Sequence, residues 1–140
     1  MFFFDASALV KRYISETGSA AVGRLLSSGP ASVSRLSEGE IASALARRTR
    51  EGHFTSAQRD RVIAALVRDL PALIVVEMTS EITVEARSLL RRHPLRAGDA
   101  IQLGSAVYLQ RQLGREVTFV AFDQRLRDAA REEALLTAPA

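Results

Sequence analysis

Apolar residues along the chain fall into two kinds of segment, short continuous runs and longer amphipathic stretches. The short runs are rich in β-branched and aromatic residues and predict strands at 2–4, 31–35, 72–78, 116–122 and 135–138, the last as a short edge strand. The amphipathic stretches have apolar residues three and four positions apart and predict helices at 7–14, 19–26, 36–52, 55–70, 79–92, 98–114 and 123–135.

Capping and turn residues support these boundaries. Gly29 and Pro30 form a predicted turn, and either Thr55 or Ser56 is expected to cap the fourth helix. Ser37 followed by Glu40 has the spacing of a capping box. Because strands alternate with helices along the chain, we expect an α/β fold, a three-layer α/β/α sandwich with a mostly parallel central sheet and "FFF" as its buried central strand.

The composition is that of a soluble globular protein with one domain, residues 1–140. The chain is 47% apolar and 25% charged. It has no cysteine, which excludes disulfides and thiolate metal sites and is consistent with a cytoplasmic location. We find no signal peptide, and no apolar run approaches the roughly 18 residues of a membrane span.

Arginine dominates the basic residues. The net charge is +3, and Lys11 is the only lysine among 19 basic residues. Arginine contacts phosphate through paired hydrogen bonds, so Lys11, Arg12, Arg47 and Arg48 are candidate RNA-binding residues. The alternatives are codon bias in a GC-rich genome and solvated helix faces.

The two histidines lie in predicted loops without partners at metal-ligand spacing. We therefore expect His53 and His93 to be surface residues.

Four of the 16 acidic residues occupy positions unlike the rest. Asp5 and Asp123 directly follow predicted strands, Glu40 lies in the first turn of a helix that follows a strand, and Asp99 begins a long helix. Each has a structural explanation, since the three aspartates are suitable helix caps and Glu40 suits a capping box. In a parallel sheet, however, the strand ends and the following helix starts share one edge, where ligands bind.

Carboxylates that converge at such an edge repel one another unless a cation lies between them. Mg²⁺ and Mn²⁺ prefer these oxygen ligands, and paired ions activate water in phosphodiester cleavage. If the four carboxylates converge, the sequence predicts a Mg²⁺ or Mn²⁺ site.

Four segments, in order, resemble PIN-domain ribonucleases, in particular VapC-type toxins of bacterial toxin–antitoxin pairs. They are "FFDASALVKRYISETGS", "VSRLSEGEIASALARR", "LRAGDAIQLGSAVYL" and "FVAFDQRL", which place the family's acidic residues at Asp5, Glu40, Asp99 and Asp123. The resemblance covers residues 2–135. Ala121 stands where the family often carries Thr or Ser.

The resemblance implies Mg²⁺- or Mn²⁺-dependent RNA hydrolysis, with all four acidic residues catalytic. It implies that Asp5 and Asp99 bind the metal, that Glu40 and Asp123 hold a second ion or its water, and that Ser7 orients this group. It also implies a homodimer and inhibition by a cognate antitoxin whose tail occupies the active-site groove.

Other function classes stay open on the sequence alone. One is a non-catalytic PIN-like protein that binds RNA or a partner, which metal binding would distinguish. Another is a DNA nuclease of the same fold, because carboxylates with metal do not themselves recognise the 2′-hydroxyl. An aspartyl phosphatase is disfavoured, because such enzymes usually have a second acid two residues on, where this chain has Ser7.

Overall fold

Five short strands form one fully parallel sheet in the computed structural model, which describes residues 1–139. The order is β3-β2-β1-β4-β5, so β1 is central and β5 lies at an edge, as predicted. The strands are β1 (Phe2–Phe4), β2 (Ala31–Ser34), β3 (Ile74–Val76), β4 (Thr118–Val120) and β5 (Leu136–Ala138).

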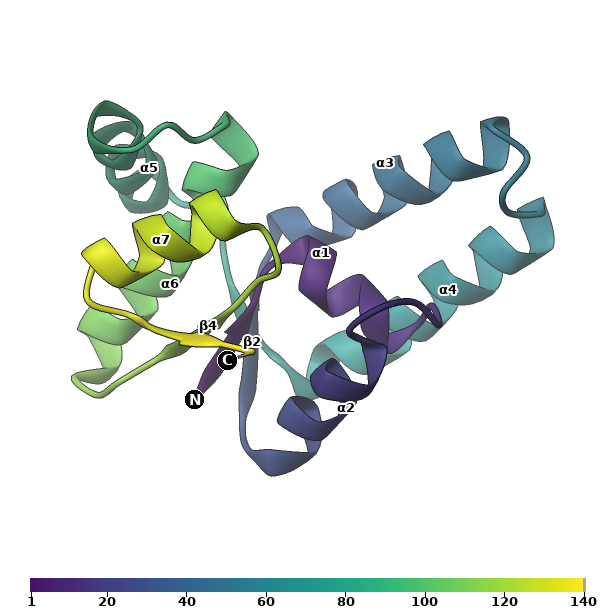
Figure 1. Ribbon diagram of the computed structural model, residues 1–140, viewed down its shortest axis with the longest axis horizontal. Coiled ribbons are helices and arrows are strands. Elements are labelled where there is room, and N and C mark those ends of the chain that lie inside the picture. Colours follow the sequence, from purple (N-terminus) through teal and green to yellow (C-terminus); the bar gives the residue numbers. More distant parts are fainter. Residues whose placement is uncertain (140) are drawn as a thin grey trace.

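Helices cover both faces of this sheet, which confirms the predicted three-layer α/β/α architecture (Figure 1). One face carries α1 (Ala6–Leu9), α2 (Ser19–Ser28), α3 (Leu36–Arg50) and α4 (Ser56–Asp69), and the other carries α5 (Ser80–Arg92), α6 (Ala97–Leu113) and α7 (Gln124–Glu132). Short 3₁₀ turns occupy Val10–Arg12 (η1) and Leu70–Ala72 (η2). No helix within residues 1–139 is long and apolar enough to cross a membrane.

The alternation of side chains along β1 divides the core into two clusters. Phe3 faces α5, α6 and α7 and stacks on Phe119 of β4, with ring centroids 5.8 Å apart. Phe2 and Phe4 face the opposite layer, where Phe4 packs in a cluster with Ile41 and Leu45 of α3. Because successive residues of a strand point to opposite faces, three phenylalanines in a row supply both clusters.

The pairing register of β1, β2 and β4 brings the carboxyl ends of these three strands together. Phe4 pairs with Val120, the last residue of β4, and with Val33, one residue before the end of β2, so the three strands end within one residue of one another. The residues that follow them therefore emerge at one edge of the sheet.

Several boundaries differ from the sequence predictions. β4 ends at Val120 rather than at Phe122, so Phe122 leaves the sheet. The predicted helix 7–14 is a short α-helix continued by the 3₁₀ turn η1. Thr55 does cap α4, and its capping box with Gln58 is complete.

The capping box predicted for Ser37 and Glu40 is wrong. Helix α3 begins at Leu36, so Ser37 lies inside it, and the Leu36 N–H donates to the Ser34 hydroxyl over 3.1 Å. Both residues of the predicted box are consequently free for contacts with α6.

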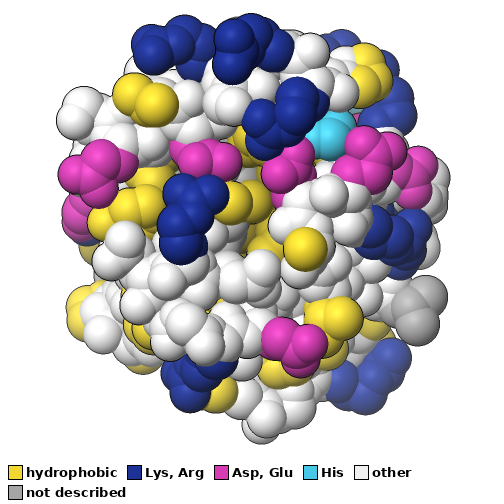
Figure 2. Space-filling view, turned by 90° about the vertical axis from the view of Figure 1, so that its left-hand side faces the viewer, with side chains coloured by type: hydrophobic (Ala, Val, Ile, Leu, Met, Phe, Trp, Pro, Cys, Tyr) yellow, Lys and Arg dark blue, Asp and Glu magenta, His cyan; other side chains and the backbone are white. Residues whose placement is uncertain are grey.

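His93 is also not the surface residue that we predicted, whereas His53 is exposed. The His93 side chain is 5% exposed, and its Nε2 lies 2.6 Å from a Glu133 carboxylate oxygen, which also accepts from Arg92. Burial raises the pKa of Glu133, but hydrogen bonds from His93 and Arg92 outweigh it and hold that pKa below its ordinary range. This contact joins the end of α5 to the end of α7, on a face where acidic and basic side chains intermingle (Figure 2).

Side chains on the buried side of α6 should matter more for stability than those on its exposed side. Leu103 is 0% exposed and Leu113 is 37% exposed. Leu103→Ala should lower the free energy of unfolding by about 3 kcal/mol, because a buried cavity replaces the side chain. The matched variant Leu113→Ala should change it by less than about 1 kcal/mol. Urea titration measures both, and equal losses would contradict the assigned burial.

Candidate active site

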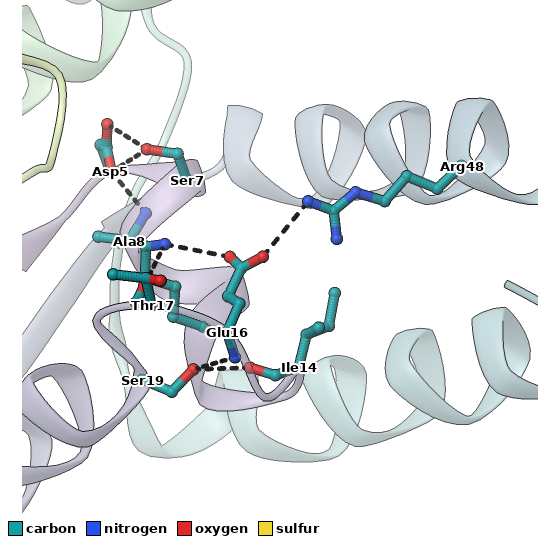
Figure 3. A network of polar contacts seen from close by, with 9 residues as sticks. Asp5, Ser7, Ala8, Ile14, Glu16, Thr17, Ser19 and Arg48 are labelled. Carbon is teal, nitrogen blue, oxygen red and sulfur yellow. Dashed lines mark hydrogen bonds and ion pairs between the residues drawn. The ribbon is translucent and has the colours of Figure 1, made fainter. Parts of the chain in front are cut away.

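Asp5 stands at the end of the central strand and also caps the first helix. Its backbone N–H donates to the Val120 carbonyl over 3.1 Å, which extends the β1–β4 ladder by one bond. Its carboxylate accepts from the Ala8 N–H at 2.7 Å and from the Ser7 hydroxyl at 3.0 and 3.1 Å (Figure 3). The side chain is 5% exposed, so these contacts fix its orientation.

Asp99 lies in the first turn of α6, but it is not the helix cap. The N-cap position belongs to Arg96. Helix α6 packs along α5 and also contacts α3, α7 and β2, so it places Asp99 near the ends of the central strands. The predicted N-cap position is therefore confirmed for Asp5 and wrong for Asp99, whose carboxylate instead accepts from the backbone N–H of Arg96.

Asp123 and Glu40 complete the predicted set from two further helices. Asp123 caps α7 by accepting from the Leu126 N–H at 3.1 Å, and its side chain is exposed. Glu40, on α3, accepts from the Gln102 amide at 2.7 Å. The neighbouring Glu38 instead pairs with Arg35 at 2.7 Å.

The four carboxylates line one pocket of about 400 Å³ at the edge where the central strands end. Three further side chains line it that the sequence analysis did not select: Arg96, Gln102 and Arg125. The detectable signal was an amide within the apolar run of α6, three residues after Asp99. The two arginines had a comparable signal, since each lies within three residues of a selected aspartate.

Burial and mutual repulsion shape the electrostatics of this pocket. Burial raises the pKa of Asp5 to about 7; hydrogen bonds from Ala8 and Ser7 oppose the rise, and the charges of Asp99 and Glu40 add to it. Burial and the nearby Asp123 raise the pKa of Asp99, and Arg96 and Arg125 partly offset the rise. The acidic residues therefore interact with one another, and a cation among them would relieve this repulsion.

The donor set fits a hard divalent cation. Carboxylates and a hydroxyl line the pocket, with no sulfur or imidazole ligand. Within residues 1–139, no three acidic or histidine side chains stand close enough together to hold one ion as they lie.

A second, more apolar pocket of about 590 Å³ adjoins the first and contains most of the predicted RNA-binding residues. Lys11, Arg47 and Arg48 line it, whereas Arg12 is exposed outside it. Glu16 pairs with Lys11 at 3.1 Å and with Arg48 at 3.3 Å (Figure 3). These two cations are thus partly neutralised, and Arg47 has no ion-pair partner within residues 1–139.

Fold and pocket together define the class of protein. Residues 2–132 match the family model of the PIN domain, and the chain belongs to this family.

Two ribonucleases from Mycobacterium tuberculosis are similar to this chain over nearly its whole length. Ribonuclease VapC45 (strain CDC 1551 / Oshkosh) and Ribonuclease VapC49 (strain ATCC 25618 / H37Rv) are each 35% identical to it over 144 aligned positions, which cover 99% of this chain and 94% of the relative. The chain is homologous to these VapC ribonucleases, which confirms the resemblance seen in the motifs.

Solved structures share the fold at lower identity. M. tuberculosis VapC20, described as a toxin that cleaves the sarcin–ricin loop, superposes with a TM-score of 0.68 at 22% identity, over 92% of this chain and 95% of that one. FitAcB from Neisseria gonorrhoeae superposes with a TM-score of 0.67 at 12% identity, over 98% and 96% of the two chains.

Replacement of Asp5 is expected to stabilise the metal-free protein in a pH-dependent manner. The pKa of Asp5 rises from 3.8 to about 7 on folding, so the wild type loses stability as the pH increases through this window, and the loss is complete above it. Asn caps a helix as well as Asp but does not ionise. Asp5→Asn should therefore gain more stability over the wild type at pH 8 than at pH 5.

Urea titration of both proteins at the two pH values, with EDTA present, measures this difference. The matched variant Asp60→Asn removes an exposed carboxylate on α4 and should show no such pH dependence relative to the wild type. Equal gains for Asp5→Asn at pH 5 and pH 8 would refute the buried-charge explanation.

Proposed function

We propose that this chain is a metal-dependent endoribonuclease that acts as the VapC-type toxin of a toxin–antitoxin system. The observation that carries this proposal is the convergence of Asp5, Glu40, Asp99 and Asp123 on one pocket at the functional edge of the sheet. The names of the relatives support RNA as the substrate and support the toxin role.

Each side chain has a distinct part in this proposal. Asp5 and Asp99 hold Mg²⁺ or Mn²⁺, and Glu40 and Asp123 bind a second ion or orient water. Ser7 fixes the Asp5 carboxylate through its hydroxyl, with hydrogen bonds of 3.0 and 3.1 Å. The bound ion supplies an activated water and stabilises charge on the phosphate during hydrolysis. No side-chain nucleophile is required.

Arg96 and Arg125 are proposed to bind the RNA backbone beside the reacting phosphate. Both are exposed, both line the acidic pocket, and neither has an ion-pair partner within residues 1–139. Guanidinium groups bind phosphate oxygens in pairs, so these residues can draw a polyanion toward a pocket that would otherwise repel it. Lys11, Arg12, Arg47 and Arg48 would contact phosphates further along the strand.

Two partners follow from the same proposal. A cognate antitoxin would cover the active-site groove, since the related structures include a toxin–antitoxin complex from Klebsiella pneumoniae and VapBC-1 from Haemophilus influenzae. A second copy of this chain would complete a homodimer. Val84 and Leu90 of α5 are exposed apolar side chains that such an interface could bury.

The catalytic proposal predicts a separation of folding from activity at Asp99. Purified protein should cleave RNA with Mg²⁺ or Mn²⁺ but not with EDTA. Asp99→Asn should reduce the rate by at least about 100-fold, which corresponds to about 3 kcal/mol, while the protein stays folded. A fluorescent RNA assay and circular dichroism measure the two properties.

The same assay decides among the function classes. A DNA oligonucleotide of identical sequence should remain intact, and efficient cleavage of it would indicate a DNA nuclease. If the folded wild type binds no Mn²⁺ in calorimetry and cuts neither substrate, the chain is a non-catalytic binding protein. Wild-type activity in Asp99→Asn would exclude the proposed mechanism.

If Arg125 contacts an RNA phosphate, replacing it should change the salt dependence of RNA binding. In the inactive Asp99→Asn background, Arg125→Gln should weaken RNA binding and reduce the slope of log K against log salt by about 0.7, because one phosphate contact is lost. Arg24→Gln is the matched control, since Arg24 is exposed on α2 and does not line the pocket. Fluorescence anisotropy at several salt concentrations gives both slopes, and an unchanged slope for Arg125→Gln would remove it from the interface.

A further inference from the structure

Two residues of α6, one turn apart, hold the Glu40 carboxylate between them. Gln102 donates from its amide nitrogen to one Glu40 oxygen over 2.7 Å and to the Ser37 hydroxyl over 3.1 Å. Gly98 lies against the other oxygen, and a Cβ atom at this position would stand 3.1 Å from it. Asp99, between these two residues in sequence, belongs to the same helix.

The orientation of the Gln102 amide follows from its partner. An ionised carboxylate can only accept hydrogen bonds, so the NH₂ group must face Glu40. The Gln102 amide oxygen is left buried with no hydrogen-bond partner in the described part of the chain. The residue is 2% exposed, so bulk solvent does not reach this oxygen.

A buried oxygen without a partner lowers stability, and such a group requires an explanation. An apolar residue of the same size would fill the space without this cost. The amide contributes here only through its NH₂ group. This donor fixes the carboxylate of Glu40, on α3, relative to that of Asp99, on α6. Glu40 and Asp99 come from helices on opposite faces of the sheet, so their separation is otherwise set only by packing between layers.

We propose that Gln102 is a positioning residue, which, together with the space at Gly98, holds the Glu40 carboxylate in the acidic pocket that it shares with Asp5 and Asp99, where it takes part in divalent-cation binding and RNA cleavage. This inference rests on the proposed function, because it assigns Glu40 to the catalytic pocket. Gln102 itself contacts neither the substrate nor the reacting atoms.

The test replaces the amide with an apolar side chain of similar length. Gln102→Met should lower kcat for RNA cleavage at saturating Mn²⁺ at least tenfold, change KM less than twofold, and weaken Mn²⁺ binding in calorimetry. The Tm of the metal-free protein should be unchanged or higher, since the unpaired oxygen is removed. Gln112→Met, an exposed substitution on the same helix, should match the wild type in all four measurements.

A double-mutant cycle shows whether Gln102 acts through Glu40. In a Glu40→Gln background, Gln102→Met should cause no further loss of kcat or of Mn²⁺ affinity. Gly98→Ala offers an independent route, because its methyl group displaces the Glu40 carboxylate; it should lower kcat in the wild type but not in a Glu40→Ala background. This variant decides the question if Gln102→Met does not fold.

Failure of this inference is distinguishable from failure of the proposed function. Cleavage by the wild type with loss in Asp99→Asn supports the function whatever Gln102 does. If Gln102→Met then cleaves RNA and binds Mn²⁺ like the wild type, or loses the same factor in the Glu40→Gln background, the positioning role is wrong. If the wild type cuts no RNA, Mn²⁺ affinity across the cycle decides alone, and absence of Mn²⁺ binding overturns the inference.

Discussion

Repulsion among carboxylates at the end of the central strand is the constraint on which the site depends. Asp5 is almost fully buried, and Asp99 and Glu40 add negative charge beside it. Such repulsion lowers the stability of the fold, yet the protein retains it at the end of the central strand of the sheet. The two hydrophobic clusters on the opposite faces of β1 provide stability that offsets this repulsion.

The layers of the sandwich contribute unequally to the pocket. Asp5 comes from the sheet and Glu40 from the helices on one face, whereas Asp99 and Asp123 come from the helices on the other. Helix α6 connects these parts, because it contacts α5, α7, α3 and β2. Its contact with Glu40 is therefore both a packing interaction and a link across the site.

The sequence was sufficient to predict the succession of strands and helices along the chain. It was not sufficient for details that depend on contacts between distant segments. The position of "FFF" before Asp5 indicated a central strand because the run is apolar and short. The capping box at Ser37 failed because α3 begins one residue earlier, at Leu36, and the contacts that Ser37 and Glu40 make instead are to Gln102, 65 and 62 residues away. His93 was misjudged for the same reason, since its partner Glu133 lies 40 residues further on. Gln102 itself was missed because its one local sign, a single amide in an apolar helix, does not reveal partners 65 and 62 residues away.

Because the strands are short, changes in strand length directly affect the position of Asp5. Each strand has three or four residues, so a slip of one position between β1 and its neighbours would carry Asp5 about 3.3 Å along the sheet and turn it toward the opposite face. Insertions and deletions within strands would thus remove the acidic residue from the pocket. Length variation among related chains is accordingly expected in the connections distant from this edge, such as the turn between α3 and α4.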